Sequence, residues 1–319
     1  VNLLKLFLEA DGFDINEKIS DEYLGDFTPL KFAAKKNNQE IIKVLFEQPK
    51  IDICEKCFND CSLLTRIAIP SSITKIGNKA FMNCASLIEV IIPDSVTSIG
   101  DDAFNKCYSL IKITLSSSLT AINENTFFKC ISLKQISLPS SIRSIGSGAF
   151  MKCKSLIEIE IPQRISSIRQ NAFYGCKSLI KITLPISVNS FGYCAFKKCI
   201  SLSQISLPPT LISIGNDAFF KCSSLMEIII PSSVTSVGRE AFSQCTKLKK
   251  VVIPSSLKMI KENTFLGCKS LEYISIPSSV TIIGYNAFSE CTSLSEIILP
   301  SFADLNKIGI GPDTKVTRI

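Results

Sequence analysis

A unit of 23 residues recurs through most of this chain and limits what the chain can fold into. Phe returns at the same position of every unit, and Cys follows it three residues later, with no gap in either column. The phenylalanines are Phe58, Phe81, Phe104, Phe127, Phe150, Phe173, Phe196, Phe219, Phe242, Phe265 and Phe288, and the cysteines run from Cys61 to Cys291. A unit this short cannot bury its apolar face alone and must stack on its neighbours. The sequence therefore predicts a repeat solenoid.

The unit reads P-S-S-[IV]-x-x-I-G-x-x-A-F-x-x-C-x-S-L-x-x-I-x-[IL]. In the copy from Pro139 to Ile161, the segment 156–161 has the spacing Leu-x-x-Ile-x-Ile, which predicts a strand whose alternate side chains face inward. The segment 142–145 predicts a second, shorter extended piece, and the segment 149–153 has the spacing of one helical turn. Equivalent strands of successive units are expected to pair in one parallel ladder. The constant letters are interpreted as core.

Glycine recurs at one position of the unit, but not in every copy. Asn123, Arg169 and Lys261 replace it in three units. Because a left-handed backbone would hardly tolerate Arg or Lys, this position is interpreted as one of tight packing or a turn and not of obligate positive φ.

The repeat pattern resembles the BspA-type leucine-rich repeat, which is also known from treponemal proteins. The resemblance covers residues 54–308 and implies a leucine-rich-repeat parallel-strand ladder. It also implies a non-catalytic function, because BspA-like proteins of bacteria and parasitic protists are surface antigens and adhesins. Such proteins bind host matrix proteins or neighbouring cells.

Residues 1–53 have a different pattern. The segment 26–53 resembles an ankyrin repeat, because Thr-Pro-Leu at 28–30 would open a first helix and the apolar residues within 41–45 would line a second. The segment 3–16 resembles the second half of a preceding unit, with a small insertion after it. The resemblance implies short all-helical ankyrin-like repeats, one partial and one full, with more units before Val1.

The register of the repeats defines the expected domain boundaries. Ile53 is already in register with Ile76, so residues 1–53 should join rigidly to the solenoid at 54–308 and cap its open end. After Leu299 the register slips by two residues. Residues 309–319 are therefore expected to be a truncated or degenerate C-terminal end.

The chain has 14 cysteines but no His and no Trp. Buried reduced thiols are expected for the repeated cysteines, since stacked side chains of the same rotamer do not give a disulfide torsion. The absence of His removes the commonest general base, and no phosphate loop or carboxylate pair stands outside the repeat. Cys54, Cys57 and Cys61 could hold zinc or cycle as a dithiol, but no second CxxC or His completes a site. We therefore predict no catalytic, cofactor-binding or metal site.

The outward positions of the predicted strands vary from unit to unit and are the candidate binding face. One column cycles through Glu, Lys and Gln, and the next is more apolar towards both ends, so that Ile229 with Val252 is the better contact patch. Two interpretations remain open: charge pairing that sets register and solubility, or a surface selected by a ligand. The candidate residues are Glu89, Lys112, Glu158, Glu160, Lys181, Glu227, Ile229, Lys250, Val252 and Tyr273.

A second candidate surface is basic. Lysines directly precede or follow several of the repeated cysteines and should align as a stripe, the basic edge, which consists of Lys106, Lys129, Lys152, Lys154, Lys177, Lys198 and Lys221. With a formal net charge of +7, this stripe could attract acidic glycans, anionic lipid or nucleic acid. No aromatic residues are expected between the lysines for base stacking, so nucleic acid is disfavoured. The alternative is a solvated edge that prevents sheet aggregation.

These observations together predict a non-catalytic protein-binding repeat protein. The partner would be a host matrix or cell-surface protein if the chain is extracellular, and a cytoplasmic protein if it is an intracellular scaffold. The ankyrin segment, the unpaired Cys column and the lack of Asn-x-Ser/Thr sequons favour the cytoplasm over the cell surface. No apolar run reaches the roughly 18 to 20 residues of a transmembrane helix. An enzyme using Cys54 and Cys57 is the remaining alternative.

Overall fold

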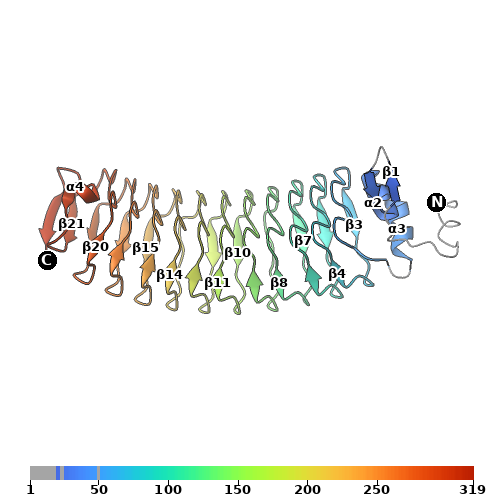
Figure 1. The fold of residues 1–319 in the computed structure, drawn as a ribbon, viewed down its shortest axis with the longest axis horizontal. Helices are drawn as coiled ribbons and strands as arrows, with labels where there is room; N and C mark the ends of the chain where they lie inside the picture. The colour runs from blue at the N-terminus through green and yellow to red at the C-terminus, as the bar shows by residue number, and fades with distance from the viewer. Residues whose placement is uncertain (1–18, 22–24, 49–50) are drawn as a thin grey trace.

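The chain forms an elongated solenoid of stacked coils with short helices at both ends (Figure 1). This computed structural model describes residues 19–21, 25–48 and 51–319. A parallel-strand solenoid with coils of 23 residues is confirmed.

Most coils contribute one three-residue strand and, after a turn, one two-residue strand. The three-residue strands are β3 (Arg66–Ala68), β5 (Glu89–Ile91), β7 (Lys112–Thr114), β10 (Glu158–Glu160), β12 (Lys181–Thr183), β15 (Glu227–Ile229), β17 (Lys250–Val252) and β19 (Tyr273–Ser275). The two-residue strands are β4 (Lys75–Ile76), β6 (Ser98–Ile99), β8 (Ala121–Ile122), β9 (Ser144–Ile145), β11 (Ser167–Ile168), β13 (Ser190–Phe191), β14 (Ser213–Ile214), β16 (Ser236–Val237), β18 (Met259–Ile260) and β20 (Ile282–Ile283). The other elements are β1 (Ile19–Asp21), β2 (Gly25–Phe27), α2 (Pro29–Lys35), α3 (Gln39–Phe46), β21 (Glu296–Leu299), α4 (Leu305–Ile308) and β22 (Lys315–Arg318).

Equivalent residues of successive coils pair in parallel, so that Ile159 of β10 faces Ile182 of β12. The ladder of three-residue strands is nevertheless interrupted, which corrects the expectation of one ladder. The coils that contain Gln135 and Gln204 form no three-residue strand, and the ladder divides into β3-β5-β7, β10-β12 and β15-β17-β19-β21-β22. Within the described chain, residues 135–137 form no backbone hydrogen bond with the coils on either side.

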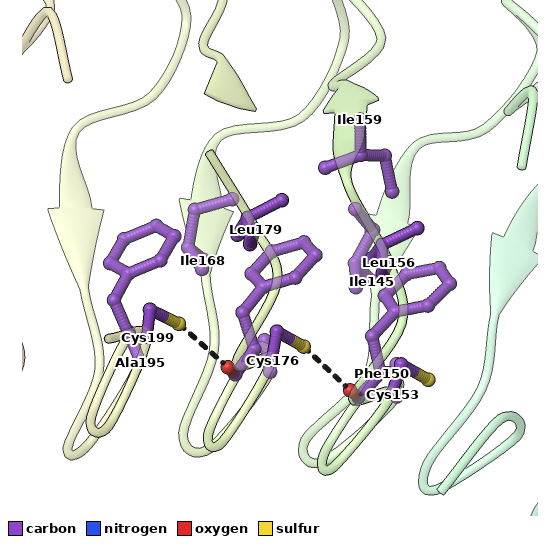
Figure 2. Close-up of a cluster of buried hydrophobic side chains, with 14 of the residues drawn as sticks. Ile145, Phe150, Cys153, Leu156, Ile159, Ile168, Cys176, Leu179, Ala195 and Cys199 are labelled. Carbon is purple, nitrogen blue, oxygen red and sulfur yellow. Dashed lines mark hydrogen bonds between the residues drawn. The ribbon is translucent and has the colours of Figure 1, made fainter. Parts of the chain in front are cut away.

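A stack of phenylalanine rings runs through the core from Phe58 to Phe288. All eleven repeated phenylalanines are buried, and successive ring centroids lie between 4.8 and 5.8 Å apart with nearly parallel planes. Offset stacking of this kind stabilises aromatic pairs beyond the effect of burial. The side chains of several coils around Phe150 are drawn in Figure 2.

The helices α2 and α3 close the N-terminal end of this core. Thr28 caps α2 by accepting from the Lys31 amide, and Phe46 of α3 lies 6.4 Å from the ring of Phe58. The Gln39 side chain donates to the carbonyl oxygen of Arg66 at 3.1 Å. The predicted helix pair is therefore present. Its ankyrin identity stays a prediction, and the partial unit expected at 3–16 lies outside the described residues.

The segment expected to be a helical turn is a run of tight turns. The Cys153 amide donates to the carbonyl of Phe150, three residues back, at 3.1 Å. The amides of Phe150 and Lys152 instead point along the solenoid and donate to Ala172 and Tyr174 of the next coil, at 2.9 and 2.7 Å. This alternation places Lys152 in the left-handed region, with φ of +62°. The turns of successive coils thus form a third ladder of backbone hydrogen bonds along the solenoid.

The repeated glycine has an ordinary φ, as predicted, and its role is close packing. A Cβ added to Gly215 would lie 2.6 Å from the backbone carbon of Gly192 in the preceding coil. Real Cβ atoms do not approach backbone this closely, so the glycine lets successive coils pack tightly.

The C-terminal segment forms a final coil that is shorter than the 23-residue unit. Lys315 of β22 pairs with Glu296 of β21, only 19 positions earlier. Between them, Asp304 caps α4, and the carbonyl of Ile308 accepts the Phe288 amide at 2.9 Å. The helix therefore continues the turn ladder where a full repeat would otherwise stand.

Candidate functional site

The outward side chains of the three-residue strands form one exposed surface, the strand face. Glutamate and lysine of neighbouring coils form exposed ion pairs on it, at 3.2 Å for Glu89 with Lys112 and 2.8 Å for Glu227 with Lys250. Exposed pairs of this type contribute about 0.2 to 1 kcal/mol each and fix the register of parallel strands. The pairing supports the interpretation of these four residues as a register device.

An apolar patch lies on the strand face beyond these ion pairs. It consists of Ile229, Val252 and Tyr273, which are exposed by 56%, 41% and 46%. Ile229 and Val252 are direct partners in the ladder, and Lys250 of the same strand pairs with Tyr273. The structure thus brings together three of the predicted residues. Aromatic side chains within a polar surrounding are typical of the centre of a protein interface.

A groove opens on the strand face where the coil of Gln135 leaves the ladder. It has a volume of about 580 Å³. The predicted residues Glu158, Glu160 and Lys181 line it together with Gln135, whose amide lies 3.4 Å from the Glu158 carboxylate. The backbone groups of 135–137 make no ladder bonds there. The groove therefore combines charged side chains with a break in the backbone ladder.

Sequence reasoning missed an exposed apolar column beside the strand face. The residue that follows the core Leu is 39% to 51% exposed in five coils, and it is Ile88, Ile111, Ile157, Ile180 and Met226. The signal was present in the sequence as an apolar residue between the core Leu and a charged position. It was overlooked because the Leu-x-x-Ile spacing alone does not reveal that this position turns outward.

The lysines of the basic edge align along one side of the solenoid, as predicted, but aromatic rings lie between them. The Lys152 ammonium lies 6.0 Å from the ring of Phe128 and 5.9 Å from that of Tyr174. The Lys198 ammonium lies 5.7 Å from the same Tyr174 ring, on the side of the following coil. The expectation that aromatics are absent from this edge was wrong, because these rings come from the position just before the lysine and alternate with other residues from coil to coil.

The repeated cysteines are free thiols that donate to backbone carbonyls, and all of them except the half-buried Cys291 are buried. The Cys176 thiol, for example, donates to Phe150 of the preceding coil at 3.1 Å (Figure 2). Burial raises the pKa of this thiol well above its usual value, and it raises the pKa of Cys61 and Cys245 to about 12. Since the thiolate is the nucleophile, these thiols are unsuited to catalysis.

The cluster at Cys54, Cys57 and Cys61 follows the same pattern. A hydrogen bond with the Cys54 side chain and then burial raise the pKa of Cys57 well above its ordinary value. The Cys61 thiol lies 3.7 Å from the carbonyl oxygen of Lys31, where it packs against the helical cap. Among the described residues, no group of three or more His, Cys, Asp or Glu side chains could hold a metal ion.

Comparison with protein-family models identifies the repeat. The model described as the BspA type leucine rich repeat region matches residues 51–179, 121–249 and 213–311. This chain belongs to the BspA-type leucine-rich repeat family. Nothing in this family's architecture or in the described residues points to catalysis.

Three solved structures share the fold. A leucine rich cell surface protein from Faecalibacterium prausnitzii is 28% identical, with a TM-score of 0.57 over 85% of this chain and 83% of its own. A leucine-rich repeat protein from Eubacterium ventriosum is 24% identical, with a TM-score of 0.50 over 81% and 84%. The pneumococcal vaccine antigen PcpA is 21% identical, with a TM-score of 0.52 over 84% and 76%. A comparison with curated proteins found no match.

The described helices are short. Within residues 19–21, 25–48 and 51–319, no helix has the length and apolar content needed to cross a bilayer.

Proposed function

We propose that this chain is a non-catalytic repeat protein that binds another protein through the strand face. The apolar patch of Ile229, Val252 and Tyr273 is the observation that carries the proposal. Ile229 and Val252 are ladder partners in one outward column, Tyr273 follows Lys250 in the other outward column, and the Glu227–Lys250 ion pair lies beside them. Tyr is a preferred interface anchor because it buries a large area and loses little entropy.

The strand-face groove supplies a second contact region for the same partner. A side chain of the partner could enter this groove between the coils of Gln135 and Glu158. Glu158, Glu160 and Lys181 would then select its side chains. An extended surface with separate apolar and polar contact regions suits a folded protein better than a small ligand.

The proposed setting is the cell surface, with an antigen-like or adhesin-like function. The similarity to a cell surface protein at 28% identity supports this proposal. An intracellular scaffold is the second candidate, and the free buried thiols together with the N-terminal helix pair support it. Localisation of the full-length product distinguishes them. Protein on the cell surface would contradict the scaffold, and retention inside the cell would contradict the adhesin.

The binding proposal is tested by removing the apolar patch without disturbing the ladder. In the variant Ile229→Thr, Val252→Thr and Tyr273→Gln, each new residue already occupies the same column elsewhere, as Thr183 and Gln135 show. A partner is captured with the intact chain and purified, and its affinity is measured by calorimetry. We expect a loss of about thirtyfold or more, since one aromatic anchor such as Tyr273 contributes about 2 kcal/mol.

The control removes a similar amount of apolar surface from the face formed by the two-residue strands. Ile212→Thr, Met259→Ser and Ile282→Ser change residues exposed by 51%, 37% and 49%. This variant should bind within about twofold of the unaltered chain. Equal affinities for both variants, or a loss confined to the control, would refute binding through the strand face.

A further inference from the structure

The lysines of the basic edge occupy a backbone position that does not favour them. Lys106, Lys129, Lys152, Lys198 and Lys221 all have a left-handed backbone, with φ between +59° and +62°. This conformation costs a residue with a Cβ about 1 to 2 kcal/mol, whereas Gly and Asn adopt it readily. Other coils use Asn83, Gly175 and Gly267 in the same column. The fold therefore does not require lysine there, and a surface property accounts for five lysines better than the backbone does.

Their charges are not neutralised within the protein. Among the described ion pairs, none involves the seven lysines of the basic edge, although Lys197 nearby pairs with Asp217 at 2.8 Å. Successive coils are stacked about 4.8 Å apart, so neighbouring lysines repel one another. Aromatic rings hold the side chains in place instead, with Lys129 and Lys221 lying 5.2 and 5.3 Å from Phe128 and Phe220.

A groove of about 480 Å³, the edge groove, lies at the middle of this row. Gly175 forms part of its lining in the column where the neighbouring coils carry Lys152 and Lys198, and this leaves an opening between the two. No acidic residue lines the groove. Its lining consists of Tyr108, Lys129, Ile131, Lys152, Lys154, Tyr174, Gly175, Lys177 and Lys198.

We propose that the edge groove binds an acidic polysaccharide, at a site separate from the strand face. Five ammonium groups around one groove match a chain that carries sulfate or carboxylate groups at regular intervals. Tyr108 offers a hydroxyl group and apolar ring surface to the sugar rings, Tyr174 offers its hydroxyl group, and Ile131 adds a further apolar contact. The row of lysines continues beyond the groove in both directions, as an extended polymer requires.

The same geometry disfavours two other polyanions. Single-stranded nucleic acid binds by stacking bases on open aromatic faces, but lysine ammonium groups lie over the rings of Phe128 and Tyr174. An acidic peptide gains affinity from backbone hydrogen bonds. Here the amides of Lys152 and Gly175 already donate to the next coil, at 2.7 Å each. The groove thus offers side-chain ammonium groups as its main donors.

The test measures binding of the full chain to heparin, a sulfated polysaccharide, by titration at several salt concentrations. The variant Lys152→Gln, Lys154→Gln and Lys177→Gln removes three groove lysines, and Gln244 shows that Gln is tolerated in the strained column, with φ of +60°. The control Lys112→Gln, Lys181→Gln and Lys250→Gln removes the same charge from the strand face. Unfolding curves establish that both variants are folded.

The groove variant should lose roughly a hundredfold in affinity, since each lysine beside an anionic surface contributes roughly fivefold. The control should lose less than about threefold, and the salt dependence should weaken only in the groove variant. Equal losses in both variants would overturn the proposal, because net charge alone would then explain binding. Tighter binding to poly-uridylate RNA or to phosphatidylserine vesicles than to heparin would also overturn it, in favour of nucleic acid or a membrane surface.

Discussion

Truncation of one ring in the phenylalanine stack tests how the solenoid is held together. In Phe150→Ala, a fully buried ring is removed whose centroid lies 5.5 Å from Phe127 and 5.4 Å from Phe173. Burial loss and the remaining cavity cost about 3 to 5 kcal/mol for such a change. The turn ladder pins the backbone on both sides, since the Phe127 and Phe150 amides donate to the next coils at 2.9 Å. The coils therefore cannot close the cavity, and we expect the upper half of this range.

The consequence should be a loss of cooperativity as well as of stability. Each coil contacts only its neighbours, so the defect weakens two interfaces and leaves the coils on either side intact. Equilibrium denaturation followed by circular dichroism should then resolve two transitions. Phe302→Ala is the control, because this ring is 52% exposed and its loss should cost less than about 0.5 kcal/mol. A single transition at the midpoint of the unaltered chain would refute a core that depends on stacked rings.

Three further predictions concern the turns, the thiols and the C-terminal cap. Lys152→Gly should stabilise the chain by about 1 kcal/mol and Gly175→Ala destabilise it by a similar amount in chemical unfolding, because both positions have positive φ. Since burial raises the pKa of thiols such as Cys61 to about 12, the folded chain keeps protons that the unfolded chain loses. Its free energy of unfolding should be unaffected below about pH 8.5 and then fall towards pH 12, by about 1.4 kcal/mol per pH unit for each such thiol. Urea titrations across this range would contradict the idea if stability stayed constant. Asp304→Ala should lower the free energy of unfolding by about 1 kcal/mol because it removes the cap of α4. Faster amide hydrogen exchange at the C-terminal end would show this.

The core could be predicted from the sequence because it depends on the period alone. Phe150, Cys153 and Leu156 recur at a fixed spacing, and identical neighbours in a stack must occupy identical places. Replacement of the repeated glycine by Arg169 and Lys261 correctly excluded a positive φ, but only the structure distinguishes close packing from a turn at this position.

The turns and the edge could not be predicted in the same way. The spacing of Ala149, Phe150 and Cys153 is compatible with both a helical turn and a run of tight turns, and only the hydrogen bonds to the next coil distinguish them. Lys152 and Tyr174 are 22 positions apart in the sequence, yet the stacking of coils places one over the other. Such contacts depend on the rotation of each coil relative to its neighbour.

The sequence by itself determined that this chain is a solenoid, which residues form its core, and that its variable positions form its surface. A repeat of 23 residues leaves no other way to bury so many apolar side chains. The tertiary structure decided where grooves open on that surface. Interruption of the ladder at Gln135 and the opening at Gly175 both depend on how neighbouring coils meet. A 23-residue unit determines its own inward and outward positions, but grooves arise from contacts between units.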